Sequence, residues 1–215
     1  MSRKSGYILG VDNSIFLLLS IVAFVFIFPI IDNEFINDIF VTVAYTVVLL
    51  SIFSIIGKKF KWMKYLVIVA IIANSLLVFI QDRYLMATVF TVSAITFTIA
   101  AGILINHIAA NKNVSISVVV QAISGYLLIG IVGVLLNAIL LSFNENALSM
   151  AGDESKFSSV IYYSFITLTT IGYGEILPVT VCARSVSIFI GAAGQIYLTV
   201  IIAMIVGKYL TTKRN

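Results

Sequence analysis

The chain has 215 residues, of which 61% are hydrophobic and only 10% are charged. A soluble domain carries about a quarter charged residues, so this composition excludes a soluble protein and indicates an integral membrane protein. The net charge of +4 does not indicate nucleic-acid binding, because the basic residues cluster in short loops where membrane orientation explains them. The single cysteine, Cys182, excludes an intrachain disulfide and any multi-cysteine metal site.

Apolar segments long enough to cross a bilayer, which takes about 20 residues, recur along the chain. The six predicted spans are, in chain order, Ser14–Ile31, Ile36–Gly57, Tyr65–Ile80, Tyr84–Ile108, Val114–Phe143 and Cys182–Tyr209. A further apolar segment, Phe157–Thr169, has about 13 residues, a length typical of a re-entrant or buried helix. We therefore predict an all-α membrane protein with six transmembrane helices and one re-entrant helix.

The charges between these segments alternate in sign, as expected of a multi-pass protein that follows the positive-inside rule. Basic residues predominate at both ends of the chain and after the second and fourth spans: Arg3, Lys4, Lys58, Lys59, Lys61, Lys64, Lys112, Lys213 and Arg214. Acidic residues predominate in the other loops: Asp32, Glu34, Asp38, Asp82, Glu145, Asp153 and Glu154. We therefore predict a protein of the cell membrane with both termini in the cytoplasm and the re-entrant helix dipping in from outside.

The stretch TTIGYGE, from Thr169 to Glu175, suits neither a lipid-facing helix nor a packed core. Non-helical backbone survives at membrane depth only where it is buried in protein or lines water. Gly172 and Gly174 permit unusual dihedral angles at alternate positions, so successive carbonyls can turn to one side. A ring of such carbonyls from several subunits would replace the water around a bare cation, and the Thr170 hydroxyl would extend the row inward. The carboxyl end of the re-entrant helix would also favour a cation at the bilayer centre.

At TTIGYG the sequence resembles the filter signature of tetrameric potassium channels, Thr-Val-Gly-Tyr-Gly, with Ile171 in place of valine. The resemblance implies a four-helix transmembrane domain over residues 1–110, in the position of a voltage sensor. It implies a pore domain over residues 111–215, built of an outer helix, a pore helix, the filter and an inner helix. Because one filter strand supplies a quarter of the cage, it also implies a homotetramer surrounded by membrane lipid.

The same resemblance implies that the filter holds dehydrated potassium ions, the permeant ligand, and that no other cofactor is needed. The filter residues would be Thr170, Ile171, Gly172, Tyr173 and Gly174, with ions at Thr170, Ile171, Gly172 and Tyr173. Thr169, Glu175 and Tyr163 would support the filter. The family usually has Asp at the position of Glu175, whose longer side chain can still reach an aromatic residue such as Tyr163. Ile166 replaces an acid found in some bacterial members, so their buried acid pair is absent.

Three residues of the last span have two interpretations each. Gly191 and Gly194 are either a gating hinge or helix-packing sites, since many family members place a hinge glycine about where Gly194 lies. Gln195 aligns with a position that faces the central cavity in family members, where a polar ring would favour a hydrated ion. The alternative for Gln195 is a subunit contact. We favour the cavity and leave the role of the two glycines open.

The six-span layout resembles the voltage-gated and cyclic-nucleotide-gated branches of the family, but the charges of a voltage sensor are missing. The fourth span, Tyr84–Ile108, contains no Arg or Lys, and Arg83 precedes it at the outer edge beside Asp82. Moving one charge through the membrane potential is worth about 2.3 kcal/mol per 100 mV, and steep sensors move 3–4 charges per subunit. One peripheral arginine supplies far less. We therefore predict weak or absent voltage dependence.

The first four spans are predicted to form a structural collar around the pore. Small and hydroxylated residues, which suit close helix packing in lipid, recur along the fourth span: Thr88, Thr91, Ser93, Thr96 and Thr98. The alternative is a lipid or small-molecule site within this domain, with Asn74 as a polar contact, although Asn74 more simply bonds a neighbouring helix. His107, at the cytoplasmic end of the fourth span, is either an interfacial residue or a sensor of internal pH.

These patterns predict a potassium-selective channel that conducts K+ passively, with weak or no voltage dependence. They do not predict an enzyme or a nucleic-acid-binding protein, because no catalytic triad, phosphate loop or paired carboxylate lies at membrane depth. One alternative is a weakly selective cation channel, for which Glu175 is the only reason in the sequence. The other is a subunit of a pore-loop potassium transporter. Those transporters usually join four pore modules in one chain and degrade the motif around a single glycine, unlike this chain.

Overall fold

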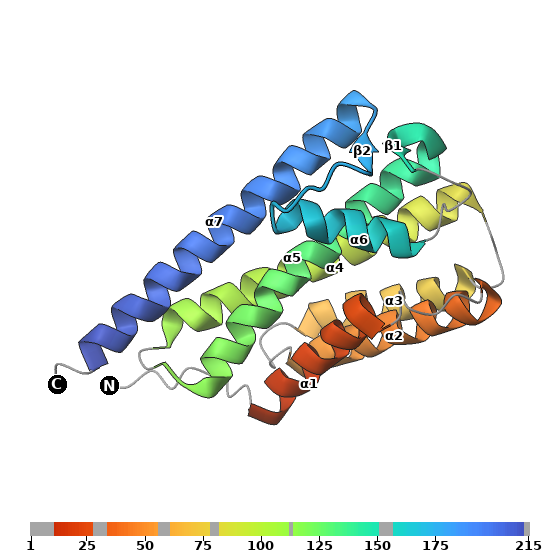
Figure 1. The fold of residues 1–215 in the computed structure, drawn as a ribbon. Helices are drawn as coiled ribbons and strands as arrows, with labels where there is room; N and C mark the ends of the chain where they lie inside the picture. The colour runs from red at the N-terminus through yellow and green to blue at the C-terminus, as the bar shows by residue number, and fades with distance from the viewer. Residues whose placement is uncertain are drawn as a thin grey trace.

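The computed structural model describes residues 11–27, 34–55, 61–77, 82–111, 114–150 and 157–212. Within these ranges the chain is almost entirely helical (Figure 1). The helices are α1 (Val11–Val22), which continues as a short π-helix (Ala23–Ile27), α2 (Glu34–Ile55), α3 (Lys61–Leu77), α4 (Arg83–Ala110), α5 (Ile116–Phe143), α6 (Phe157–Leu168) and α7 (Val181–Thr212). A 3-10 turn (Glu145–Ala147) and two short strands, β1 (Leu148–Ser149) and β2 (Leu177–Pro178), complete the described elements.

Three helices in the described part of the chain are long and apolar enough to cross a membrane. They comprise Arg83–Ala110, Ile116–Phe143 and Val181–Leu210, which agree with the last three predicted spans. The first three predicted spans end at Ile31, Gly57 and Ile80, outside the described residues, and the apolar helices found there are shorter. Those three crossings, and therefore the count of six, stay a prediction. The re-entrant segment is confirmed as a short helix, the 12-residue α6.

Both ends of α4 are closed by local side chains, which explains why this helix is long and regular. The Asp82 carboxylate accepts a hydrogen bond from the backbone N–H of Leu85 at 2.9 Å, so it caps the helix N-terminus. At the other end the Asn111 side-chain amide donates to the His107 carbonyl oxygen at 2.9 Å. Four threonine hydroxyls within the helix bond the backbone carbonyl one turn earlier: Thr88, Thr91, Thr96 and Thr98. These bonds satisfy polar groups where no water is at hand.

The helices α1 to α4 pack into one hydrophobic core with the pore segment. Of all helix pairs, α4 and α5 share the most extensive contact, and the main buried cluster runs from Leu17 in α1 through Phe97 in α4 to Val160 in α6. Asn74 in α3 donates from its side-chain amide to the Thr42 carbonyl of α2 at 3.5 Å, the interhelical bond expected of it. The core is thus continuous across the predicted domain boundary at residues 110/111, and the division into two domains stays a prediction.

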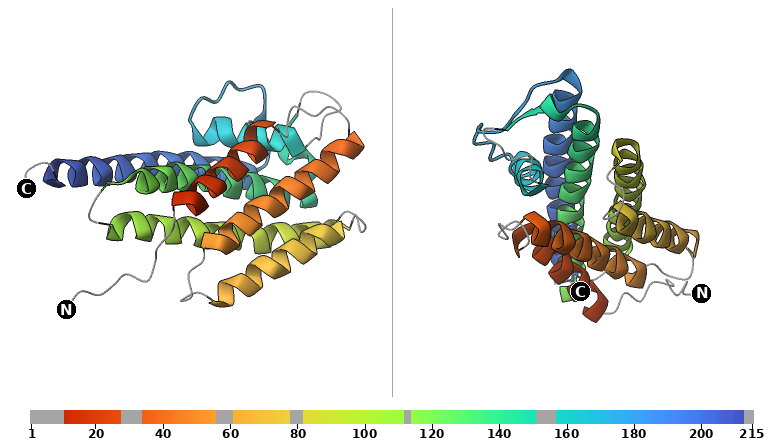
Figure 2. Two further views of the ribbon diagram at one scale, coloured as in Figure 1. Left: turned by 90° about the horizontal axis from the view of Figure 1, so that it is seen from below. Right: turned by 90° about the vertical axis from the view of Figure 1, so that its right-hand side faces the viewer.

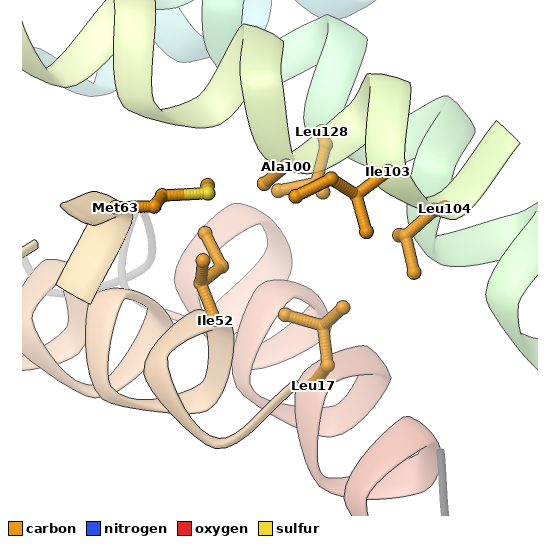
Figure 3. Close-up of a pocket in the computed structure, with 7 residues that line it drawn as sticks. All are labelled: Leu17, Ile52, Met63, Ala100, Ile103, Leu104 and Leu128. Carbon is orange, nitrogen blue, oxygen red and sulfur yellow. The ribbon is translucent and has the colours of Figure 1, made fainter. Parts of the chain in front are cut away.

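A small cavity lies where α1 to α5 meet (Figure 3). Its volume is about 10 Å³, and its seven lining side chains are all apolar: Leu17, Ile52, Met63, Ala100, Ile103, Leu104 and Leu128. A cavity of this size holds about one water molecule at most, and an apolar lining offers that water no partner. The described residues therefore provide no room here for a lipid or drug-sized molecule, and the predicted collar fits this packing better.

The pore segment is a hairpin of α5 and α7 with α6 laid against it. Figure 2 shows α6 on one side of the α5–α7 pair and α3 and α4 on the other. The strands β1 and β2 pair antiparallel, with Leu148 opposite Pro178 and Ser149 opposite Leu177. A backbone bond of 2.9 Å from the Val179 N–H to the Ala147 carbonyl extends this pairing. The chain that leaves α6 is thereby returned to the start of α7, so residues 169–176 form a closed loop.

Candidate functional site

The loop after α6 alternates between left-handed and ordinary backbone. Thr170, Gly172 and Gly174 have φ values of 59°, 50° and 91°, and they are the residues with positive φ in the described part of the chain. The alternation begins at Thr170, two residues before the first of the two glycines that predict it. Left-handed φ is costly for a β-branched side chain, about 1–3 kcal/mol, so the surrounding structure must hold Thr170 in place.

The backbone N–H groups of the loop turn back to the end of α6. Those of Ile171 and Gly172 both donate to the Ile166 carbonyl, at 2.9 and 3.2 Å, and the Thr170 N–H donates to the Thr167 carbonyl at 3.1 Å. Alternating right- and left-handed residues bring successive N–H groups to one side of a chain, which leaves the carbonyls to the other side. The N–H groups of Ile171 and Gly172 thus face α6, and the row of carbonyl oxygens on the other side of the loop stays a prediction.

The loop is fully at the surface of the single chain. Residues 169–175 are all exposed, with 54% of Ile171 and 75% of Tyr173 accessible. In a membrane protein, bare carbonyls and exposed apolar side chains both need a covering that one copy does not supply.

Within the single chain Glu175 interacts with Tyr162, and the expectation that it reaches Tyr163 stays a prediction. The hydrogen bond to the Glu175 carboxylate raises the pKa of Tyr162 to about 12, so the phenol stays a donor at neutral pH. Tyr163 faces α7, where its hydroxyl lies 2.6 Å from the Ser187 hydroxyl. A 12-residue helix has too few turns for its apolar pattern to show which of two adjacent tyrosines faces the filter. Sequence reasoning therefore did not identify Tyr162.

Thr169, which was predicted to support the filter, and Ile166, which replaces an acid of some family members, both lie at the end of α6. The Thr169 hydroxyl donates to the Phe165 carbonyl at 2.7 Å. This bond caps the last turn of α6 and does not involve a filter residue. The Ile166 side chain is buried, with 7% exposed, in the position where some family members carry an acid. Apolar packing therefore replaces an acid pair behind this filter, while the Ile166 backbone carbonyl receives the two filter amides.

Glycines of α5 admit bulky side chains from the two helices that carry the loop. At Gly130 an added Cβ would lie 2.5 Å from Cζ of Phe165, and at Gly125 it would overlap the hydroxyl of Tyr197. That hydroxyl donates to the Ala122 carbonyl at 2.7 Å. The glycines therefore let α6 and α7 approach α5 closely. Sequence reasoning did not single them out, because a sequence does not show which faces of three apolar helices meet.

Of the two candidate hinge glycines, Gly194 is a close-packing site. A Cβ at Gly194 would lie 2.5 Å from the Leu168 carbonyl oxygen, whereas one at Gly191 would lie at an ordinary 3.6 Å from the Thr167 carbonyl. Helix α7 runs unbroken from Val181 to Thr212 through both. The packing alternative is thus observed for Gly194, and a hinge role for either glycine stays a prediction.

Gln195 lies at the inner end of the filter. Its side-chain amide donates to the Thr170 hydroxyl at 3.4 Å, and the side chain is otherwise exposed. This bond holds the strained threonine from the α7 side. The placement agrees with a residue that faces a central cavity, which only an assembly of several copies would enclose.

The end of α7 far from the filter is bonded to the end of α4. The Lys208 ammonium group donates to the carbonyls of Ile108 and of Ala109, the latter at 3.0 Å. At the preceding residue of α4, the His107 ring nitrogen Nδ1 lies 2.6 Å from the Gln121 amide oxygen of α5. Gln121 donates in turn to the Ser14 hydroxyl of α1 at 3.0 Å. Helices α1, α4, α5 and α7 thus share one polar junction at this end.

The comparisons with known proteins identify the segment that carries this loop. Residues 126–211, which run from α5 through α6 and the loop to the end of α7, match the family model described as "Ion channel". The searches of curated proteins and of solved structures found no match.

Proposed function

From the match of residues 126–211 to the ion channel family model, we propose that the chain is one subunit of a potassium-selective channel that conducts K+ passively across the cell membrane. The observation that carries this proposal is the alternating backbone of Thr170–Gly174, whose N–H groups turn toward Ile166. Carbonyl oxygens arranged in this way can replace the hydration shell of a bare cation.

The conducting row would consist of oxygen atoms of the chain itself. The carbonyls of Thr170, Ile171, Gly172 and Tyr173 would bind K+, and the Thr170 hydroxyl would add the innermost ligand. Gly174 would complete the outer mouth. The partial negative charge at the carboxyl end of α6 would favour a cation just inside the filter. K+ is the permeant ion here, and no further cofactor is proposed.

We propose a homotetramer embedded in membrane lipid. A single filter strand offers ligands from one side only, so four copies are needed to surround an ion. The exposed filter supports this assembly. Helix α7 supports it too, because only 22% of its most apolar segment is buried within the single chain. Its exposed residues include Ile188 at 73% and Ile196 at 64%. Both termini are proposed to lie in the cytoplasm.

A weakly selective cation channel remains the second candidate, because Glu175 and its bond to Tyr162 depart from the family pattern of an Asp at this position. A transporter subunit is less consistent with one complete GYG motif in a single module.

The test is a current recorded from purified protein in a planar bilayer, with K+ on one side, Na+ on the other, and a voltage ramp. We expect reversal close to the potassium equilibrium potential and large unitary currents. Reversal near zero would support the weakly selective channel instead, and slow saturable flux without unitary currents would support a transporter.

A matched pair of glycine variants ties the current to the filter. Gly172→Ala places a side chain at φ 50° and should abolish selective current, because such a backbone angle disfavours any Cβ. Gly102→Ala in α4, where a Cβ meets nothing within 4 Å, should leave the current unchanged.

A further inference from the structure

Helix α6 is fastened to α5 at three levels. At its carboxyl end the Tyr126 hydroxyl donates to the Leu168 carbonyl at 3.4 Å. In the middle, the Phe165 ring fits against Gly130. At the third level, the Asn137 side-chain amide donates to the Ser164 hydroxyl at 3.0 Å. Only the third joins two side chains by a hydrogen bond.

The Asn137–Ser164 pair is completely enclosed. Both residues have 0% exposed surface. The Asn137 amide oxygen has no hydrogen-bond partner among the described residues. Turning the amide by 180° would let Ser164 donate to that oxygen but would leave the amide nitrogen unpaired instead. In either orientation, one polar atom of Asn137 is buried without a partner in the part of the chain that the structure describes.

Such an arrangement is a poor source of stability. A leucine at residue 137 would have similar size and no polar atom to satisfy, and a half-satisfied buried amide costs free energy. A hydrogen bond between two side chains differs from apolar packing in being directional, so it accepts few alternative registers of one helix on the other. The physical advantage of this pair is therefore the position of α6 rather than the strength with which α6 is held.

The position of α6 bears directly on the filter. Ser164 lies two residues before Ile166, whose carbonyl receives the N–H groups of Ile171 and Gly172. A slip of α6 by one residue would move that carbonyl by about 1.5 Å along the helix axis and about 100° around it. The two filter amides would then lose their common acceptor, and the carbonyl row would lose its alignment.

We propose that Asn137 is a positioning residue for the ion filter, acting through its hydrogen bond to Ser164. The proposal rests on the function proposed above, since it assumes a selective filter for Asn137 to position. Asn137 itself touches no ion. It fixes the depth and rotation of α6, and Ile166 transmits this position to the filter backbone.

The experiment measures the ratio of potassium to sodium permeability of assembled channels in planar bilayers. Asn137→Leu and Ser164→Ala should each lower this ratio by about tenfold, the equilibrium change that corresponds to one net hydrogen bond. The double variant should be no worse than either single one, because both remove the same bond. Ser164→Thr keeps the hydroxyl and should restore the wild-type ratio.

Ser124→Ala provides the matched control. Ser124 is equally buried in α5, but its hydroxyl bonds only the Val120 carbonyl of its own helix, so its loss should not change selectivity. Size-exclusion chromatography selects assembled protein, and Ser164→Ala removes a single oxygen atom, which keeps the test open if Asn137→Leu fails to assemble.

The outcomes separate this proposal from the function on which it depends. Assembled Asn137→Leu and Ser164→Ala channels that reverse at the wild-type potential would overturn the positioning role while leaving the potassium channel intact. A wild-type channel that reverses near zero would overturn both, since no selective filter would then exist. An equal loss of selectivity in Ser124→Ala would also count against it, because any buried hydroxyl of α5 would then matter as much.

Discussion

At the residue scale, the proposed filter is held mainly by uncharged groups. The Ile166 carbonyl takes the place of a buried acid by accepting two filter amides, and Gln195 bonds the strained Thr170 from the other side. The ionisable residue Glu175 lies at the outer end, bonded to Tyr162. The geometry of this filter therefore depends on how closely its neutral neighbours can approach.

Gly194 tests this dependence on close approach. We expect Gly194→Ala to destabilise the protein by about 1–3 kcal/mol, because its methyl group would meet the Leu168 carbonyl at 2.5 Å and force α6 and α7 apart. Gly191→Ala, with 3.6 Å of clearance, should change stability little. The measurement is the thermal midpoint of detergent-solubilised protein. Equal midpoints for the two variants would contradict the packing role of Gly194.

Tyr162 and Tyr163 provide a second residue-scale test. Tyr162→Phe removes the donor to Glu175, so we expect shorter conducting bursts in recordings at symmetrical potassium, with little change in thermal stability since Tyr162 is exposed. Tyr163→Phe should do the reverse. It loses a bond to Ser187 in a buried site and should cost about 1 kcal/mol of stability without shortening the bursts. Short bursts in Tyr163→Phe alone would restore the pairing of Glu175 with Tyr163.

How far the sequence predicts the site depends on what each feature requires. The alternating dihedrals follow from Gly172 and Gly174, because a glycine in the sequence indicates a position where positive φ is readily adopted. The left-handed Thr170 and the partners of Glu175 do not follow, since they depend on the rotation of α6 against α7. Asn137 and Ser164 were missed for the same reason: a polar residue in an apolar helix shows that a partner is needed but not where the partner lies.

At the element scale, the long helices are predictable and their contacts are not. The apolar lengths of α4, α5 and α7 match the predicted spans within a few residues, because a bilayer imposes a minimum length. The short α6 was likewise recognised by its length. The sequence does not show, however, that the far end of α7 is bonded to the end of α4, because that contact joins residues 100 positions apart.

Lys208 is the residue that makes this contact, and its removal tests whether the four-helix part of the chain influences the pore. The ammonium group caps the carboxyl end of α4, where a cation is worth about 0.3–1 kcal/mol or more when partly buried. We expect Lys208→Cys, made with Cys182→Ser, to change open probability several-fold while selectivity and unitary current stay constant. Single-channel recording measures all three.

Chemical modification supplies the control for Lys208. Aminoethylation of the new thiol through a disulfide restores a positive charge at nearly the length of lysine, and it should return the open probability to the Cys182→Ser value. Modification with a neutral methylthio group should not. If the neutral group restores it equally well, the cap on α4 is not the reason for the effect.

At the scale of the whole molecule, a single chain leaves surfaces exposed that an assembly would cover. The filter has ligands on one side, α7 is poorly buried, and the apolar groove lined by Ile105, Phe189 and Ile196 is open. The core that joins α1 to α6 is, by contrast, continuous, and the small apolar cavity described within it is too small for a ligand. This contrast is what a rigid subunit that completes its site by assembly requires, and it supports the proposed tetramer and the collar.

The last prediction concerns voltage dependence and follows from the charges of α4. Arg83 is the only Arg or Lys of α4, and it stands in the first turn beside Asp82, which caps the helix at the membrane edge. A residue already at the edge traverses little of the field, so the conductance should depend only weakly on voltage. A Boltzmann fit to currents between strongly negative and positive voltages should give far fewer than the 12–16 gating charges of a steep tetrameric sensor. Arg83→Gln should leave the curve in place. A slope equivalent to about eight or more charges would contradict the prediction, and it would require that charges outside α4 cross the field.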